Sequence, residues 1–207
     1  SVQLSKADAA KRLGIDRGRP VLCYTGKVYY RYEEVSYLID IAAQLGNEAT
    51  MVIVGGRPDQ IPPWREECQR RGVQNVVFTG FRPPSDIPLF LRAADLLVMY
   101  YSPSPLNEFR SPGKLFEYLA SGTPLVAARF PGVEEVVTEG VNGFMVEPYQ
   151  PAAAASRIRA LLSTREGWQA IGARAAQTAA NYTWAHRAER FLSFAAEIAA
   201  RRLEGFR

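Results

Sequence analysis

A short segment that ends at Glu117 combines residue types that suit a phosphate ligand. Ser111 is a good N-cap residue and Pro112 suits the first helical position, so a helix is predicted to begin here. The first turn of a helix carries unpaired N–H groups and the positive end of the helix dipole, and both favour an anion. Gly113 would let that anion approach the backbone, and Lys114 adds a full positive charge. The segment is therefore a candidate phosphate site.

Glu117 lies three residues after Lys114, so both side chains are expected on one face of this helix. The helix is predicted to cover residues 114–120, because Gly122 and Pro124 follow it. A carboxylate one turn from a phosphate site is well placed to accept hydrogen bonds from a sugar diol. The segment thus resembles half of a nucleotide pocket. The alternative is an ordinary exposed helix face, where Lys and Glu are common.

The composition indicates a soluble globular protein and excludes several kinds of site. The 207 residues suit one large domain, and 47% hydrophobic and 22% charged residues are typical values. The net charge of +4 is too small to argue for nucleic acid. Cys23 and Cys68 form no metal-binding pattern, and His186 is the only histidine. Structural zinc, a disulfide scaffold and a Ser/His/Asp site are therefore not expected, and a cytoplasmic location is predicted.

Short apolar runs alternate with helical segments along most of the chain, which is typical of a parallel sheet covered on both faces. The predicted strands are residues 21–25, 50–54, 76–80, 96–100, 125–128 and 144–146. The predicted helices are residues 5–14, 33–45, 63–71, 85–94, 114–120, 151–163, 166–181 and 184–203. The fold class is therefore α/β, a doubly wound, six-stranded parallel Rossmann-like sheet with extra C-terminal helices. No run of about 18 apolar residues is present, and the first ten residues do not resemble a signal peptide.

The predicted topology brings three cations together. If the strands take the common order 3-2-1-4-5-6, strands 1 and 4 are neighbours, and the segments that follow them meet at one edge of the sheet. Lys27, Arg31 and Lys114 then surround a helix N-terminus, which suits a diphosphate. The alternative for Lys27 and Arg31 is a solvated loop. Neither a P-loop, a GxGxxG motif nor an Asp-x-Asp pair is present, so binding should depend on amides and cations.

Several blocks of sequence resemble a known family. These blocks are SPGKLFEYLASGTPLVAA at 111–128, PGVEEVVTEGVNGFMVEP at 131–148, TGK after strand 1, IVGG after strand 2 and FTGFRPPSDIPLFLRAADLLV at 78–98. Together they are similar to the C-terminal, donor-binding domain of GT-B glycosyltransferases of the group 1 (family 4) type. The resemblance covers essentially the whole chain, so residues 1–207 are predicted to form one nucleotide-sugar (donor) binding domain.

The resemblance implies roles for individual residues. Glu117 would hold the ribose hydroxyls, the cations at 27 and 31 would neutralise the diphosphate, and Gly80 and Phe81 would lie against the base. Backbone amides at the start of the helix would hold the phosphate oxygens. The implied binding residues are Gly26, Lys27, Arg31, Gly80, Phe81, Ser111, Gly113, Lys114, Leu115 and Glu117. Lys27, Lys114 and Glu117 are the implied catalytic residues, and no metal or further cofactor is expected beside the nucleoside diphosphate sugar.

The chain also departs from the family pattern. The family often carries two glutamates separated by seven residues, but here that spacing leads back from Glu117 to Phe109, and Glu108 is displaced by one. The resemblance implies that the acceptor site lies in an N-terminal domain, which is expected to be absent from this chain. That missing domain is an expected partner, and it could also carry a peripheral membrane contact.

Three functions remain open on these grounds. The first is the donor domain of a retaining, metal-independent glycosyltransferase, which would transfer a sugar from a nucleoside diphosphate sugar to an acceptor hydroxyl and would be inactive alone. The second is half of a GT-B nucleotide-sugar epimerase, which shares the architecture. The third is a non-catalytic nucleotide-binding or scaffold module, suggested by the displaced Glu108.

Overall fold

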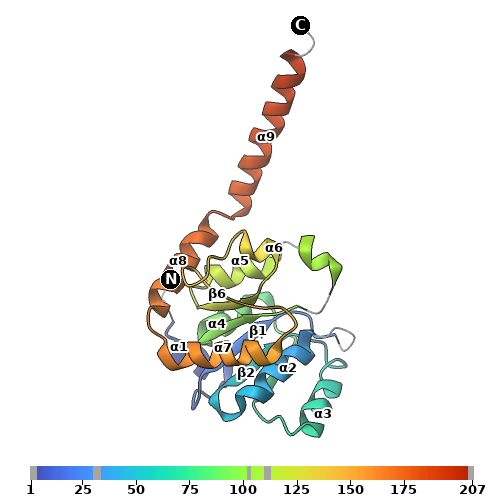
Figure 1. The fold of residues 1–207 in the computed structure, drawn as a ribbon, viewed down its shortest axis with the longest axis vertical. Helices are drawn as coiled ribbons and strands as arrows, with labels where there is room; N and C mark the ends of the chain where they lie inside the picture. The colour runs from blue at the N-terminus through green and yellow to red at the C-terminus, as the bar shows by residue number, and fades with distance from the viewer. Residues whose placement is uncertain (1–3, 30–33, 102–103, 110–112, 205–207) are drawn as a thin grey trace.

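The computed structural model describes residues 4–29, 34–101, 104–109 and 113–204. Within them, the strands form one parallel sheet in the order β3-β2-β1-β4-β5-β6, which confirms the predicted topology (Figure 1). The strands are β1 Val21–Thr25, β2 Thr50–Val54, β3 Val76–Gly80, β4 Leu96–Met99, β5 Leu125–Ala128 and β6 Phe144–Val146. All residues of β1, β4 and β5 are buried, as expected for a sheet covered on both faces.

Helices cover both faces of the sheet. Figure 1 shows α2 and α7 side by side in front of it, while α1 packs on α4 and α5 packs on α8. The α-helices are α1 Lys6–Leu13, α2 Glu34–Leu45, α3 Pro62–Arg70, α4 Ile87–Ala93, α5 Gly113–Ala120, α6 Pro131–Glu134, α7 Pro151–Thr164, α8 Trp168–Ala180 and α9 Trp184–Glu204. Short 3₁₀ helices are η1 Gly46–Glu48, η2 Pro84–Asp86 and η3 Pro105–Phe109. The doubly wound α/β class is confirmed.

Helix boundaries follow the capping chemistry of the sequence. Ser5 caps α1 by accepting a hydrogen bond from the Asp8 N–H (3.1 Å), and Gly14 ends α1 in the left-handed conformation (φ 66°). Thr183 caps α9 by accepting from the His186 N–H (3.2 Å). The predicted cap of α5 at Ser111 lies outside the described residues.

One predicted helix is divided in two. The sequence predicts a continuous helix over 85–94, but the structure has the 3₁₀ helix η2 followed by α4. Pro88 has no N–H, so it cannot donate to the carbonyl of Pro84, and the Ile87 N–H bonds that carbonyl instead. The shorter bond gives the 3₁₀ turn.

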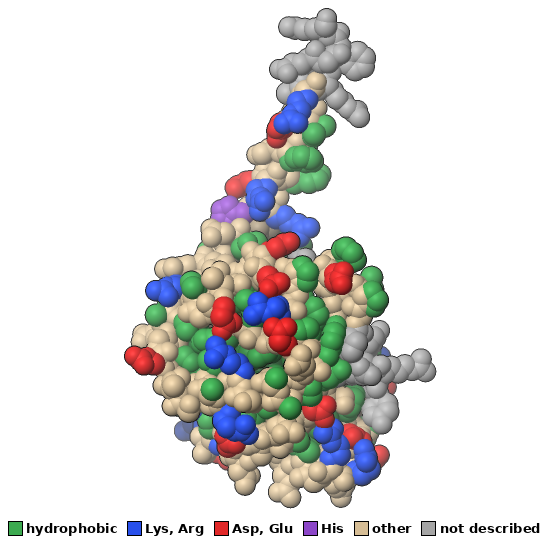
Figure 2. Space-filling model, in the orientation of Figure 1, with side chains coloured by type: hydrophobic (Ala, Val, Ile, Leu, Met, Phe, Trp, Pro, Cys, Tyr) green, Lys and Arg blue, Asp and Glu red, His purple; other side chains and the backbone are tan. Residues whose placement is uncertain are grey.

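The helix α9 extends away from the sheet (Figure 1). Its apolar side chains Trp184, Phe191, Leu192 and Phe194 are exposed, and Figure 2 shows hydrophobic side chains along the projecting segment. Figure 2 also shows Lys/Arg and Asp/Glu side chains interspersed on the visible face of the domain. Among the described residues, no helix has the length and apolar character that a membrane crossing needs.

The end of α5 lies against α8 with very little space between the two backbones. Gly122, which follows α5, has φ 68°, a conformation that favours glycine. A Cβ added to Gly172 of α8 would lie 2.0 Å from the Gly122 carbonyl oxygen. Because backbone rather than a flexible side chain blocks that position, α8 could accept a side chain at 172 only by shifting away from α5.

We therefore expect Gly172→Ala to lower the free energy of unfolding by about 1–3 kcal/mol, because overpacking outweighs the better helix propensity of alanine. Urea unfolding measures the change. The matched control is Gly113→Ala at the start of α5, where an added Cβ has nothing within 4 Å. Equal stability of the two variants would contradict the close packing of α5 on α8.

Candidate functional site

A cavity of about 490 Å³ lies at the carboxyl ends of β1, β2 and β3. Residues 25–29 line it from the end of β1, residues 54–57 from the end of β2, and Phe81 and Arg82 from the end of β3. Gln60, Ile87 and two side chains of α5, Lys114 and Glu117, complete the lining. The cavity is at the sheet edge where doubly wound folds bind their ligands.

Glycines allow the strand ends to approach one another beneath the cavity. Gly55 has φ 130°, and a Cβ there would lie 2.0 Å from the Gly26 carbonyl oxygen. The Gly55 N–H donates to the Gly80 carbonyl (3.0 Å), and the Gly26 N–H donates to the Val54 carbonyl (2.9 Å). The backbone of Gly26 and Gly55 therefore forms part of the cavity lining, together with side chains such as Val28 and Ile87.

Tyr118 attaches α5 to the end of β1. Its hydroxyl accepts hydrogen bonds from the Thr25 N–H (2.6 Å) and the Thr25 hydroxyl (3.2 Å). The side chains of both residues are buried. Burial raises the pKa of the Tyr118 phenol far above its ordinary value, so the group stays neutral. This contact holds one face of α5 at the cavity.

Lys114 lies one turn before Tyr118 and also contacts β1. Its Nζ donates to the Tyr24 hydroxyl (3.1 Å) and lies 4.1 Å from the centre of the Tyr24 ring. A Cβ on Gly26 would lie 2.7 Å from this Nζ, so glycine at 26 makes room for the lysine head. The cation is thus placed at the end of β1, beside Gly26.

Lys27 and Glu117 line the same cavity as Lys114, and both are exposed. The Lys27 Nζ lies 5.8 Å from the centre of the Tyr29 ring. Two ammonium groups and a carboxylate therefore surround one space. The ammonium groups can neutralise a diphosphate, and the carboxylate can accept hydrogen bonds from hydroxyl groups.

The structure brings together half of the binding residues that the sequence indicated. Gly26, Lys27, Phe81, Lys114 and Glu117 line the cavity. Gly80 lies next to it, Gly113 is exposed at the start of α5, and Leu115 has its side chain completely buried in the core. Only the backbone amide of Leu115 is therefore a candidate contact. Arg31 and Ser111 lie outside the described residues.

Sequence reasoning missed some residues of the site. Gly55, Gly56 and Arg57 follow β2 directly, and the parallel order of the strands was a signal that could have found them. Arg57 is exposed and pairs with Asp59 (3.0 Å). Tyr24, which contacts Lys114, was missed because it is one residue of an apolar strand, and its hydroxyl partners Glu34 and Lys114 come from two different helices.

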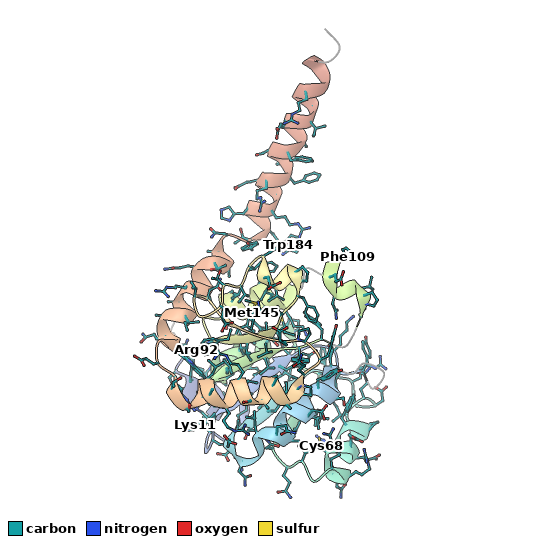
Figure 3. All side chains as sticks on the ribbon, viewed as in Figure 1. Lys11, Cys68, Arg92, Phe109, Met145 and Trp184 are labelled. Atoms are coloured by element: carbon teal, nitrogen blue, oxygen red, sulfur yellow. The ribbon has the colours of Figure 1, made fainter. Side chains whose placement is uncertain are left out.

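Glu108 does not line the cavity. It is exposed in η3, where Asn107 donates from Nδ2 to the Tyr149 hydroxyl (3.0 Å). Phe109, the next residue, is 84% exposed and is labelled on this short helix in Figure 3. In the described ranges, no three His, Cys, Asp or Glu side chains are grouped in a way that could hold a metal ion.

The fold and the cavity define the class of the protein. It is a Rossmann-like domain with a cavity at the carboxyl ends of its strands, and lysine and glycine residues line that cavity. Residues 19–164 match the family described as glycosyl transferases group 1. The chain belongs to this family, which confirms the resemblance found in the sequence.

Two relatives of this chain are glycosyltransferases with different names. The chain is 32% identical over 200 residues to a D-inositol 3-phosphate glycosyltransferase of Nocardia farcinica. The aligned region covers 90% of this chain and 42% of the relative. It is 29% identical over 165 residues to the alpha-D-kanosaminyltransferase of Streptomyces kanamyceticus. Here the aligned region covers 78% of this chain and 41% of the relative. The chain thus spans less than half the length of these relatives.

Solved structures have the same fold. HepE of Anabaena, in complex with UDP and glucose, has a TM-score of 0.71 at 26% identity, over 85% of this chain and 47% of HepE. The C-terminal domain of a group 1 glycosyl transferase from Francisella tularensis, LpcC, has a TM-score of 0.68 at 17% identity, over 87% of this chain and 93% of that domain. The chain therefore corresponds in fold to one half of a GT-B glycosyltransferase.

Removing the Tyr118 hydroxyl should destabilise the domain. We expect Tyr118→Phe to lower the free energy of unfolding by about 1–3 kcal/mol, because it leaves the buried Thr25 N–H without its acceptor. Chemical denaturation measures the loss. Tyr182→Phe, at a tyrosine that is 41% exposed, is the control and should change little. A Tyr118→Phe protein as stable as this control would show that the contact does not hold α5.

Proposed function

We propose that residues 1–207 form the donor-binding domain of a retaining, metal-independent glycosyltransferase. The domain would bind a nucleoside diphosphate sugar, with the diphosphate beside Lys27 and Lys114 and the ribose hydroxyls beside Glu117. One observation carries the proposal: these three side chains, which come from two distant segments, line a single cavity together with Gly26, Gly55 and Gly56.

In the proposed reaction an acceptor hydroxyl forms a bond to the anomeric carbon while the bond from that carbon to the β-phosphate oxygen breaks. The acceptor proton is transferred to the departing diphosphate, and the new bond forms on the face that the diphosphate leaves, so the configuration is retained. Negative charge grows on the diphosphate as it departs. Lys27, Lys114 and the N–H groups of the first turn of α5 would stabilise that charge.

Proteins similar to this chain support the proposal by their names and by the ligands in their structures. The relatives are named as glycosyltransferases, and HepE has been solved with UDP-glucose as well as with UDP and glucose. A second domain would supply the acceptor site, because the chain matches only 42% of the Nocardia relative. The isolated domain should then bind nucleotide but transfer sugar poorly. Cytoplasmic action is part of the proposal, since Cys23 and Cys68 are both buried free thiols.

Nucleotide binding tests the proposal directly. Isothermal calorimetry with UDP, GDP and ADP should give saturable binding for one of them. Lys114→Ala should then weaken binding about tenfold to hundredfold, because a hydrogen-bonded charge next to the diphosphate is lost. Lys11→Ala, at an exposed lysine of α1 labelled in Figure 3, is the matched control. No binding of any nucleotide to the unsubstituted domain would count against a donor site.

Glu117 should affect the nucleoside part of the ligand. We expect Glu117→Gln to weaken binding about fivefold, because the amide is a poorer acceptor for the ribose hydroxyls than the carboxylate. The control is Glu66→Gln, at an exposed glutamate of α3. Affinity for inorganic pyrophosphate, which has no ribose, should not fall in Glu117→Gln. An equal loss for nucleotide and pyrophosphate would contradict the assigned role.

Binding should be independent of a divalent metal, because two lysine side chains supply positive charge at the cavity. Calorimetric titrations with the nucleotide that binds best should give the same dissociation constant in magnesium chloride and in EDTA. Substantially tighter binding in magnesium would mean that a metal ion takes part.

A further inference from the structure

Three side chains form a hydrogen-bonded chain behind the cavity. The Lys114 Nζ donates to the Tyr24 hydroxyl (3.1 Å), and the Tyr24 hydroxyl donates to Glu34 Oε2 (2.9 Å). The three residues come from α5, β1 and the first turn of α2. The chain therefore connects a cavity-lining cation to a carboxylate through the buried end of a strand.

The position of Tyr24 is strongly determined by the fold. Tyr24 is fully buried in β1, where it is paired in register with Ile53 of β2. The Lys114 Nζ lies over its ring at 4.1 Å and also 5.4 Å from the centre of the Tyr101 ring. Both distances allow a cation–π attraction. The tyrosine thus offers the ammonium group a fixed hydroxyl and a fixed aromatic face.

The directions of the hydrogen bonds follow from the groups themselves. An ammonium group can only donate, so the Tyr24 hydroxyl accepts from Lys114 and has one proton left to donate. Glu34 Oε2 is the nearer acceptor at 2.9 Å, while the Lys27 carbonyl lies at 3.4 Å. Burial, followed by the negative charge of Glu34, raises the pKa of Tyr24 well above its ordinary value. The phenol therefore keeps the proton that it donates to Glu34.

Gly26 leaves space for this arrangement. A Cβ at position 26 would lie 2.6 Å from the Tyr24 hydroxyl oxygen and 2.7 Å from the Lys114 Nζ. A side chain at position 26 would therefore overlap the Tyr24 hydroxyl and the Lys114 ammonium group. With Lys114 in this position, the space at residue 26 is sufficient for glycine but not for a larger residue.

We infer that Tyr24, supported by Glu34, is a positioning residue that holds the Lys114 ammonium group at the end of β1, where it meets the diphosphate of the ligand. This inference deepens the proposed function and rests on it. A free lysine side chain would lose its rotational freedom when the ligand binds, which weakens binding. Tyr24 removes that freedom before the ligand arrives, so its hydroxyl strengthens nucleotide binding without touching the nucleotide.

Tyr24→Phe is the decisive variant, because it keeps the aromatic face and removes only the hydroxyl. We expect UDP affinity, measured by calorimetry, to fall about fivefold to tenfold, as for the loss of one hydrogen bond to a charged group. In the Lys114→Ala background the same substitution should have no further effect, because the group that it positions is absent. The control is Tyr100→Phe, another buried tyrosine, whose hydroxyl bonds the Gln150 N–H and the Glu147 carbonyl.

Nuclear magnetic resonance of the ligand-free domain gives an independent readout. With ¹⁵N-labelled lysine, the Lys114 Nζ protons should exchange slowly enough to be observed in the unsubstituted protein and in Tyr100→Phe, and should be lost in Tyr24→Phe. If Tyr24→Phe folds poorly, Glu34→Gln provides the second test, with an expected loss of UDP affinity of about twofold to threefold because a neutral acceptor replaces a charged one.

The possible outcomes separate this inference from the proposed function. A Tyr24→Phe protein with unchanged UDP affinity and an unchanged Lys114 signal would overturn the positioning role. Additive losses in the double variant would also overturn it, since they would show that Tyr24 acts independently of Lys114. If the unsubstituted domain binds no nucleotide, the proposed function fails, and the Lys114 signal still decides whether Tyr24 holds the lysine.

Discussion

The attachment of α5 to the end of β1 is the constraint on which the site depends. Tyr118 bonds the Thr25 N–H, and Lys114 bonds the hydroxyl of Tyr24, so two side chains one helical turn apart meet two consecutive residues of the strand. This is possible because β4, which leads to α5, lies beside β1 in the sheet. Glu117, on the same helix, is thereby brought to the cavity.

The site also needs space for a ligand, and glycine residues at the ends of β1 and β2 leave that space. Gly26 and Gly55 meet so closely that a Cβ at 55 would lie 2.0 Å from the carbonyl of 26. Glycine backbone therefore forms part of the cavity lining, beside the charged side chains of Lys27, Lys114 and Glu117. Membership of the glycosyl transferases group 1 family and the fold shared with one half of HepE agree with a cavity of this kind. The chain spans less than half the length of its Nocardia relative.

Much of the fold was predictable, because apolar runs and capping residues act locally. The six strand positions agree with the structure to within one residue, and the order 3-2-1-4-5-6 placed Lys27 and Lys114 at one sheet edge. The helix predicted over 85–94 was wrong at its start, because the effect of Pro88 on the preceding turn was overlooked. The roles of Tyr24 and Glu34 were not predictable, since contacts between a strand and two helices depend on how these elements pack.

The sequence by itself determined the α/β class, the family and the residue types that suit a diphosphate, since these follow from short apolar runs and from motifs within single segments. Only the tertiary structure decided what these residues contact. It placed the side chain of Leu115 in the core, Glu108 outside the cavity lining, and Gly26 where it makes room for a lysine. The physical reason is that hydrogen bonds such as Lys114 to Tyr24 join residues 90 positions apart, and only the packed sheet brings them together.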